Sequence, residues 1–187
     1  KGIKAYSLEK LSNDLVAVMD QIIPGRPAHL VGHDWGSIQT WESVTAPHLQ
    51  FRILSYTTLS GPCLDHVGFW MKDRLFSQDS AKLGKALRQL SSSWYIMAFQ
   101  LPFLAPLSWR FAGQRIHKKI AEIENVPYVH RENGAKDGVY GVNLYRANFL
   151  PSLIKPRARR TEKPVQLVVL TRDNYVGAQL FEDITTW

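Results

Sequence analysis

The apolar positions in the first part of the chain switch between the period of a helix and the runs of a strand. From Ser7 to Ile23 they recur at the spacing of one helical face, at Leu8, Leu11, Leu15, Val18, Met19 and Ile22. Ser7 stands where an N-cap belongs, and Pro24-Gly25 follows where the helix should end. We therefore predict an amphipathic helix that lies against a sheet.

Two strand-like runs and a second helix follow. The apolar run from Ala28 to Val31 predicts a strand that ends near His33, and Ser37 to Ala46 suits a helix stopped by the next proline. Ile53 to Leu59 is a β-rich run that ends at a Gly-Pro pair. Helix, strand, helix and strand in this order predict a parallel α/β architecture.

The pattern changes between about Cys63 and about Arg160. This stretch carries long helical patterns rich in aromatic residues and no convincing strand alternation. Three prolines break it, at Pro102, Pro106 and Pro127. Pro164 to Leu170 then predicts a buried parallel strand. We expect one α/β core made of residues 1–62 and 161–187, with residues 63–160 inserted as a helical unit.

Composition fits one globular domain and restricts the compartment. The chain has 187 residues, of which 45% are hydrophobic, and no apolar run approaches the ~18 residues that suggest a membrane span. A single cysteine, Cys63, rules out an internal disulfide. With no recognisable signal peptide, we expect a cytoplasmic protein that does not insert into membranes.

The distribution of charged residues along the chain does not indicate a particular binding partner. The formal net charge is +7, and its densest run is Lys155, Arg157, Arg159, Arg160 and Lys163. This run has no aromatic interleaving, and the chain has no nucleic-acid-binding signature and no zinc-ligand spacing. We interpret the run as a solvated connector and expect no nucleic-acid partner, no metal and no organic cofactor.

A five-residue motif, Gly32-His33-Asp34-Trp35-Gly36, directly follows the first predicted strand. Glycines on both sides of a central residue, between a strand and a helix, are typical of a sharp turn that exposes a nucleophile, and we expect both glycines to leave room for tight backbone packing. An aspartate in that place points to attack on saturated carbon, because the resulting ester can be cleaved by water whereas a serine ether cannot. The alternative is that Asp34 only caps the next helix.

The neighbours of Asp34 suggest supporting roles. The backbone N–H of Trp35 is placed to stabilise the oxyanion formed when such an ester is hydrolysed, and its indole N–H can also face the site. His33 should point away from Asp34, because successive strand side chains alternate. We therefore expect His33 to pack beside the turn and not to act as the base.

The motif resembles that of epoxide hydrolases and haloalkane dehalogenases, the aspartate-nucleophile branches of the α/β-hydrolase fold. Two segments favour the epoxide branch. Trp94 to Pro102 resembles the cap segment with a tyrosine five residues before the Gln of a Phe-Gln-x-Pro run, which implies Tyr95 as a ring-opening acid. Asn143 to Asn148 resembles the segment that carries the second, Tyr145.

A pair of phenols suits this chemistry, because an epoxide oxygen becomes an alkoxide as its bond to carbon breaks, and phenols can stabilise or protonate it while uncharged at rest. Both tyrosines could instead be structural. Tyr128 or Tyr140 could replace Tyr145 if the alignment of the segment has slipped. The resemblance also implies Asp173, just beyond the late strand, as the carboxylate that orients a histidine base, although it could simply be a turn residue.

The histidine itself is missing from the expected place. The six histidines are His29, His33, His48, His66, His117 and His130, and none follows Asp173, whereas the fold orders its residues nucleophile, acid, histidine. The early strands and the loop that donates the second oxyanion N–H are also lacking. We expect the sequence to be the middle of a longer protein, similar to the epoxide-hydrolase-like domains that some bacterial proteins join to a short-chain dehydrogenase/reductase domain.

The sequence thus predicts an α/β-hydrolase core and a helical cap that close over a mostly apolar pocket, acting on a small apolar epoxide and water. Two alternatives remain: a haloalkane dehalogenase that uses the same aspartate, and a non-catalytic hydrolase-fold module. The particular epoxide and a homodimeric state are both left open by these residues.

Overall fold

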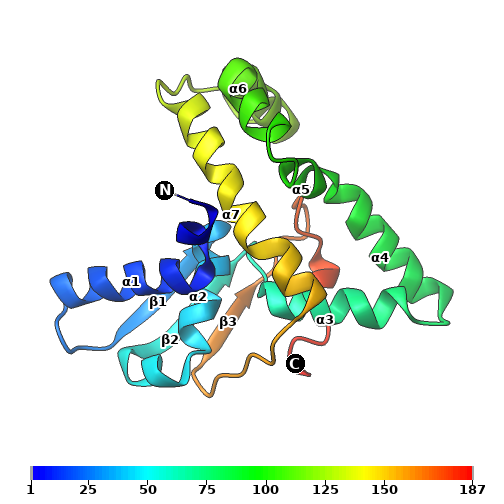
Figure 1. The fold of residues 1–187 in the computed structure, drawn as a ribbon. Coiled ribbons are helices and arrows are strands. Elements are labelled where there is room, and N and C mark those ends of the chain that lie inside the picture. The colour runs from blue at the N-terminus through cyan, green and yellow to red at the C-terminus, as the bar shows by residue number, and fades with distance from the viewer. Residues whose placement is uncertain (1, 187) are drawn as a thin grey trace.

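A three-stranded parallel sheet forms the base of the computed structural model, which describes residues 2–186 (Figure 1). The strands are β1 (Ala28–His33), β2 (Ile53–Leu59) and β3 (Val165–Val168), in that order across the sheet. β2 pairs with both neighbours, and the carboxyl ends of β1 and β2 lie at one edge because His33 pairs with Leu59. The bounds of β1 and β2 confirm the predicted strands.

The third strand differs from its prediction. β3 has 4 residues, fewer than the predicted run from Pro164 to Leu170, and its side chains are half-buried or exposed. Among the described residues no strand pairs with its outer edge, so water reaches a strand whose composition suits a buried position.

Helices before and after β1 flank the sheet. A short 3-10 helix, η1 (Ile3–Tyr6), precedes α1 (Leu8–Ile22), and the Ser7 hydroxyl accepts a hydrogen bond from the Lys10 N–H at 3.4 Å, as a cap should. α2 (Trp35–Val44) starts immediately after Asp34, two residues earlier than predicted. A second 3-10 helix, η2 (Pro47–Arg52), leads into β2.

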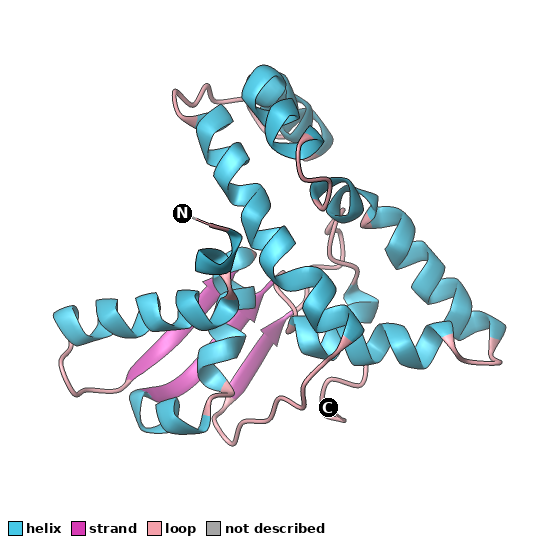
Figure 2. Ribbon diagram, viewed as in Figure 1, coloured by secondary structure: helices cyan, strands magenta, loops and turns pink. Residues whose placement is uncertain are grey.

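The described chain between β2 and β3 contains helices and no strand (Figure 2). The helices are α3 (Leu64–Leu75), α4 (Ser80–Ser92), α5 (Trp94–Phe99), α6 (Leu104–Ile123) and α7 (Gly134–Ile154). Pro102 and Pro127 lie in connections, but Pro106 does not break a helix: it lies in the first turn of α6, where a missing N–H costs nothing. After β3, a 3-10 helix, η3 (Ala178–Phe181), packs against α3 and α4.

The main core lies between α2 and the sheet. Trp41 and Val44 of α2 pack against Ile53 and Tyr56 of β2, and all four are almost fully buried. The rings of Trp41 and Tyr56 meet edge to face, with centroids 5.1 Å apart. Burial of such side chains stabilises the fold by about 2 kcal/mol each, so this contact fixes α2 on the sheet.

The basic run after α7 is not a free solvated connector. Arg157 and Arg159 both pair with the buried Asp65 at the start of α3, at 3.0 and 2.8 Å, and both also pair with Glu42 of α2. Arg159 is itself largely buried. The prediction failed for these residues because their acidic partners lie more than 90 positions away in sequence.

The described residues contain no helix that is both long and apolar enough to cross a membrane. They also contain no group of three or more His, Cys, Asp or Glu side chains arranged to hold a metal ion.

Candidate active site

Asp34 lies in a strained turn at the carboxyl end of β1. Its φ and ψ are 51° and −124°, in a region that non-glycine residues rarely adopt. Its N–H donates to the Leu59 carbonyl at 3.1 Å, and its carbonyl accepts from the Ile38 N–H at 2.9 Å, so the backbone on both sides is fixed. The side chain makes no capping hydrogen bond to α2. The capping alternative is therefore wrong.

Close backbone packing explains two glycines at this turn. A side chain on Gly32 would come within 2.7 Å of the Ser37 backbone, and one on Gly61, after β2, within 2.5 Å of the Asp34 carbonyl. Gly36, the second glycine of the motif, is different, because a Cβ there would meet nothing within 4 Å. The prediction that both motif glycines make room for backbone is right for Gly32 and wrong for Gly36.

A buried polar network supports the turn from below. The Ser37 hydroxyl contacts Tyr56 Oη at 2.6 Å and the Thr58 hydroxyl at short range, and it donates to the Gly61 carbonyl at 2.8 Å. Trp41 Nε1 donates to the same carbonyl at 3.0 Å. Burial raises the pKa of Tyr56 to about 12, so this network is neutral and every member is paired.

Aromatic side chains from four regions form a wall beside Asp34. Tyr145 of α7 meets Trp35 edge to face at 4.9 Å, and Tyr95 of α5 meets Tyr145 at 5.9 Å. Tyr175, in the loop after β3, meets Tyr95 at 5.6 Å. Segments separated by more than 100 residues thus bring the predicted Trp35, Tyr95 and Tyr145 together.

Asn148, three residues after Tyr145 on α7, hydrogen-bonds to the chain at the start of α1. Its Oδ1 accepts from the Leu8 N–H at 2.9 Å, and its Nδ2 donates to the carbonyls of Tyr6 and Leu144 at 2.9 and 2.8 Å. Asn148 therefore supplies the first turn of α1 with a partner and fixes the part of α7 that carries Tyr145.

The carboxyl of Asp34 has an altered acidity. Although Asp34 is an exposed residue, the protein groups around it displace part of its hydration, and this desolvation raises its pKa above the ordinary value of 3.8. The nearby His33 lowers the pKa, Asp173 raises it, and a hydrogen bond from the Trp35 backbone N–H lowers it. The net shift is upward.

Both phenols are held in their neutral form. Burial raises the pKa of Tyr95, and Tyr145 and the Asp34 carboxylate raise it further. Burial also raises the pKa of Tyr145, against hydrogen bonds with the side chains of Trp35 and Tyr95 that lower it. The two hydroxyls therefore form a connected pair of neutral donors that feel the charge of Asp34.

Asp173 lies near enough to Asp34 to raise its pKa, and its carboxylate also accepts hydrogen bonds from backbone N–H groups. Its Oδ1 accepts from the N–H groups of Tyr175 and Val176 at 2.8 and 2.9 Å, which closes the turn after β3. Oδ2 has no hydrogen-bond partner among residues 2–186. Asp173 therefore acts at least as a turn residue, which fixes Tyr175 beside the aromatic wall.

Among residues 2–186 no histidine forms a hydrogen bond or an ion pair with Asp173. His29 is bonded to Ser55, His66 to the Arg159 carbonyl and His117 to the Gly134 carbonyl. His33 is exposed at the end of β1, near enough to lower the pKa of Asp34. The described residues thus bring together an acid, two phenols and a second carboxylate without an imidazole base between the carboxylates.

One residue of the site, Tyr175, was missed from sequence. Tyr175 lies two positions after Asp173, which was a usable signal, but only the turn closed by Asp173 aims it at Tyr95. Tyr128, an alternative to Tyr145, is not in this wall, and its hydroxyl donates to Gln114 at 2.6 Å. Tyr140 is exposed on α7.

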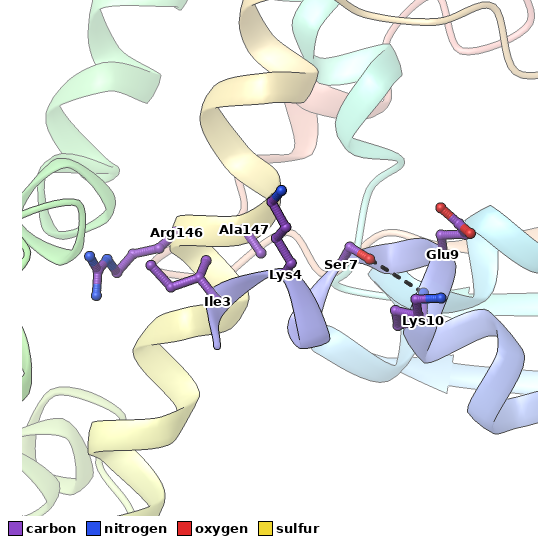
Figure 3. Close-up of a pocket in the computed structure, with 7 residues that line it drawn as sticks. All are labelled: Ile3, Lys4, Ser7, Glu9, Lys10, Arg146 and Ala147. Atoms are coloured by element: carbon purple, nitrogen blue, oxygen red, sulfur yellow. Dashed lines mark hydrogen bonds between the residues drawn. The ribbon is translucent and has the colours of Figure 1, made fainter. Parts of the chain in front are cut away.

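Two surface hollows are found among the described residues, and Asp34 lines neither of them. One, of about 420 Å³, lies between η1, the start of α1 and Arg146 of α7 (Figure 3). The other, of about 400 Å³, is lined by Asp173, Arg88 and Gln89, among others. The apolar pocket that we expected to be closed between the cap and the sheet is, among these residues, an open aromatic wall beside an exposed Asp34.

The parallel sheet, its flanking helices and the helical region between β2 and β3 define an α/β-hydrolase fold with a helical cap. Among solved structures, a variant of an epoxide hydrolase from Bacillus megaterium superposes on the whole chain with a TM-score of 0.66, at 17% identity and over 66% of its own length. A structure described as a novel epoxide hydrolase from metagenomes of hot environments gives a TM-score of 0.59 at 19% identity. It matches 99% of this chain and 64% of its own.

Two curated proteins are similar to this chain in sequence. The protein named probable oxidoreductase EphD, from Mycobacterium tuberculosis and Mycobacterium bovis, is 30% identical over the whole of this chain. The chain spans about a third of that protein's length. Epoxide hydrolase A of Mycobacterium tuberculosis is 38% identical over 65 residues, which are 34% of this chain and 19% of that protein. No family model matches the chain.

Proposed function

We propose that this chain carries the ring-opening half of an epoxide hydrolase site, with Asp34 as the nucleophile. The proposal rests on one observation: a strained aspartate that does not cap α2 lies close to two neutral phenols, whose pKa values its charge raises. The likeness to epoxide hydrolases supports it.

In the proposed reaction, one carboxylate oxygen of Asp34 attacks an epoxide carbon and forms an ester bond. The bond between that carbon and the ring oxygen breaks, and the oxygen takes a proton from Tyr95 or Tyr145, which becomes a tyrosinate. Neutral phenols suit this step, because an alkoxide is far more basic than a phenolate and therefore takes the proton of a phenol.

Water then adds to the Asp34 carboxyl carbon, the bond between that carbon and the ester oxygen breaks, and a vicinal diol leaves. Of the two protons of the water, one goes to the departing diol oxygen and one to the tyrosinate, which restores the tyrosine and the Asp34 carboxylate. The Trp35 backbone N–H, already directed at the Asp34 carboxylate, is proposed to stabilise the oxyanion of that step. Asp173 is proposed to orient the histidine base through Oδ2, while Oδ1 closes the turn. The fold's order of residues places that histidine after Asp173.

The test uses single turnover of the full polypeptide with an aryl-substituted epoxide. We expect Tyr95→Phe with Tyr145→Phe to slow ester formation on Asp34 by about 10²–10⁴-fold, measured by mass spectrometry of the Asp34 peptide. Tyr140→Phe is the matched control, because Tyr140 is exposed on the same helix as Tyr145. Equal rates in the double variant and the control would contradict the proposal.

The same variants separate the haloalkane alternative, for which Trp35 would be the halide-binding donor. If chloride release from a haloalkane proceeds in the full polypeptide and is unchanged by Tyr95→Phe, while no epoxide is opened, the dehalogenase hypothesis replaces ours. A polypeptide that forms no Asp34 ester with either substrate would favour a non-catalytic hydrolase-fold module.

A further inference from the structure

A continuous series of apolar side chains lies exposed on α4, α5 and the connection after them. Leu87, Leu90, Trp94, Met97 and Leu101 recur at intervals of three and four positions, and each is exposed, Trp94 to 69%. That spacing puts them on one helical face where the segment is helical. Tyr95 and Ile96, on other sides of α5, point inward instead.

The series continues onto α6. Phe103 and Phe111 are exposed to 82% and 78%, and Leu104 and Leu107 lie exposed between them. We call the exposed apolar residues from Leu87 to Phe111 the apolar rim. Figure 1 shows α4, α5 and α6 following one another along the side of the molecule away from β1. Exposed large apolar residues are ordinary when single, but a continuous group marks a contact surface.

The charge around the apolar rim has a single sign. From Ser80 to Ala121 the sequence has no Asp or Glu and seven Lys or Arg residues. Lys82, Lys85 and Lys119 pair with acids that lie outside this segment. The other four, Arg88, Arg110, Arg115 and Lys118, form no ion pair among residues 2–186.

The cations and the apolar residues share a face of α6. Leu104, Leu107 and Phe111 are followed by Arg115 and Lys118 at the same helical spacing, so the apolar stripe runs into a cationic one. Aromatic and aliphatic side chains beside Arg and Lys are the composition of helices that lie in the surface of an anionic bilayer.

We propose that the apolar rim is a docking surface for an anionic lipid bilayer, in which Trp94, Phe103 and Phe111 enter the headgroup region while Arg110, Arg115 and Lys118 contact lipid phosphates. A second copy of this chain fits less well, because a symmetric contact would place cations of the same sign opposite one another. This surface is separate from Asp34, so the proposal does not depend on the proposed reaction.

The test is co-sedimentation of the full polypeptide with vesicles of phosphatidylcholine mixed with phosphatidylglycerol, compared with vesicles of phosphatidylcholine alone. We expect binding to the mixed vesicles that weakens as salt is added. Each cation near an anionic surface contributes about fivefold to partitioning, so Arg110→Gln with Arg115→Gln and Lys118→Gln should weaken binding by about 100-fold. A matched charge control removes Lys10, Lys155 and Arg160, which are exposed elsewhere.

The apolar part has its own matched pair of variants. Phe103→Ser with Phe111→Ser should abolish measurable sedimentation, whereas Phe51→Ser with Phe76→Ser, which removes two exposed phenylalanines outside the apolar rim, should leave it unchanged. Circular dichroism checks that all variants fold, which is expected because every changed side chain is exposed.

Three results would overturn the proposal. They are absence of binding by the parent protein to the mixed vesicles, equal losses in rim and control variants, and equal binding to both vesicle types at all salt concentrations. Light scattering adds a further criterion: a dimer that the Phe103 and Phe111 changes convert to monomer, without any vesicle binding by the parent, would assign the rim to self-association.

Discussion

Asp34 differs from an ordinary helix-capping aspartate in its backbone and in its carboxyl group. A positive φ at a non-glycine residue costs about 1–3 kcal/mol and persists only where surrounding structure enforces it. Here the hydrogen bonds with Leu59 and Ile38 and the close approach of Gly61 supply that enforcement. In this backbone conformation the Asp34 side chain does not cap α2.

The raised pKa of Asp34 predicts a pH dependence. Only the carboxylate can attack an epoxide, and desolvation, with a smaller contribution from Asp173, raises the pKa at which that form is lost. Ester formation in single turnover should therefore fall as pH decreases through a value above 3.8, the ordinary pKa. The measurement is the rate of mass increase of the Asp34 peptide across pH, with circular dichroism to define the range in which the protein stays folded.

Asp34→Asn supplies the control for that profile and should form no adduct at any pH. A rate that stays constant as pH falls to 3.8, while the protein remains folded, would contradict the raised pKa. An adduct elsewhere in the chain with the same pH profile would remove Asp34 as the nucleophile.

At the scale of elements, two long-range contacts hold the helical region on the core. Asn148 of α7 bonds to the start of α1, and the segment after α7 is held by the pairing of Arg157 and Arg159 with Asp65 and Glu42. Both contacts follow Tyr145 in the sequence, the first of them three residues after it. The position of that phenol therefore depends on residues with no role in the chemistry.

Replacement of Asn148 should destabilise the protein, because Asn148 joins α7 to the start of α1. Asn148→Ala leaves the Leu8 N–H and two carbonyls without their partner, which should lower the free energy of unfolding by about 1–3 kcal/mol. Asn148→Asp should cost more, because a carboxylate would face the carbonyls of Tyr6 and Leu144. Urea unfolding measures both, and Asn143→Ala, five residues away on the same helix, is the control.

Asp65 predicts how stability responds to acid. Desolvation raises the pKa of its carboxyl, but hydrogen bonds from Arg159 and Arg157 outweigh this and lower it below 3.8. A lowered pKa in the folded state gives stabilisation that is present above pH 3.8 and is lost as pH falls through the lowered value. Asp65→Asn should therefore cost about 3 kcal/mol at neutral pH.

The difference between Asp65→Asn and the parent protein should shrink below pH 3.8. Denaturant unfolding at neutral and acid pH measures it, and Asp14→Asn on the outer part of α1 controls for loss of a surface carboxylate. A constant difference across pH would show that the Arg157 and Arg159 bonds do not act through the charge of Asp65.

Local pattern predicted those elements whose ends are marked by local chemistry. The first helix, β1 and β2 were found because Ser7, Pro24 and the glycines of the turns specify their ends within a few residues. β3 was predicted too long, since apolar composition does not say which edge of a strand meets water. Pro106 was taken as a break because its place in a first turn depends on where α6 begins.

The candidate site shows the same division between local and distant information. The Asp34 turn could be predicted from five consecutive residues, whereas the partners of Arg159 and the aim of Tyr175 depend on chain segments that meet only in three dimensions. Tyr95 and Tyr145 were chosen by resemblance to a family, and their meeting with Trp35 is a finding of the structure.

At the scale of the whole molecule, the arrangement is a sheet edge that carries an acid, faced by a helical region that carries phenols. Among the described residues, Asp34 is exposed and there is room for a side chain at Gly36. These residues align with about two thirds of the length of the solved epoxide hydrolase chain. Two carboxylates and two phenols from four chain segments thus converge on one place.

The most direct measurement of the ester mechanism follows oxygen through one turnover of the full polypeptide in oxygen-18 water. If Asp34 is the nucleophile, the first diol carries no label, because its new oxygen comes from the Asp34 carboxylate, and the Asp34 peptide gains one labelled oxygen. Diol that is labelled in the first turnover, with Asp34 unlabelled, would show that water attacks the epoxide directly and that no ester forms on Asp34.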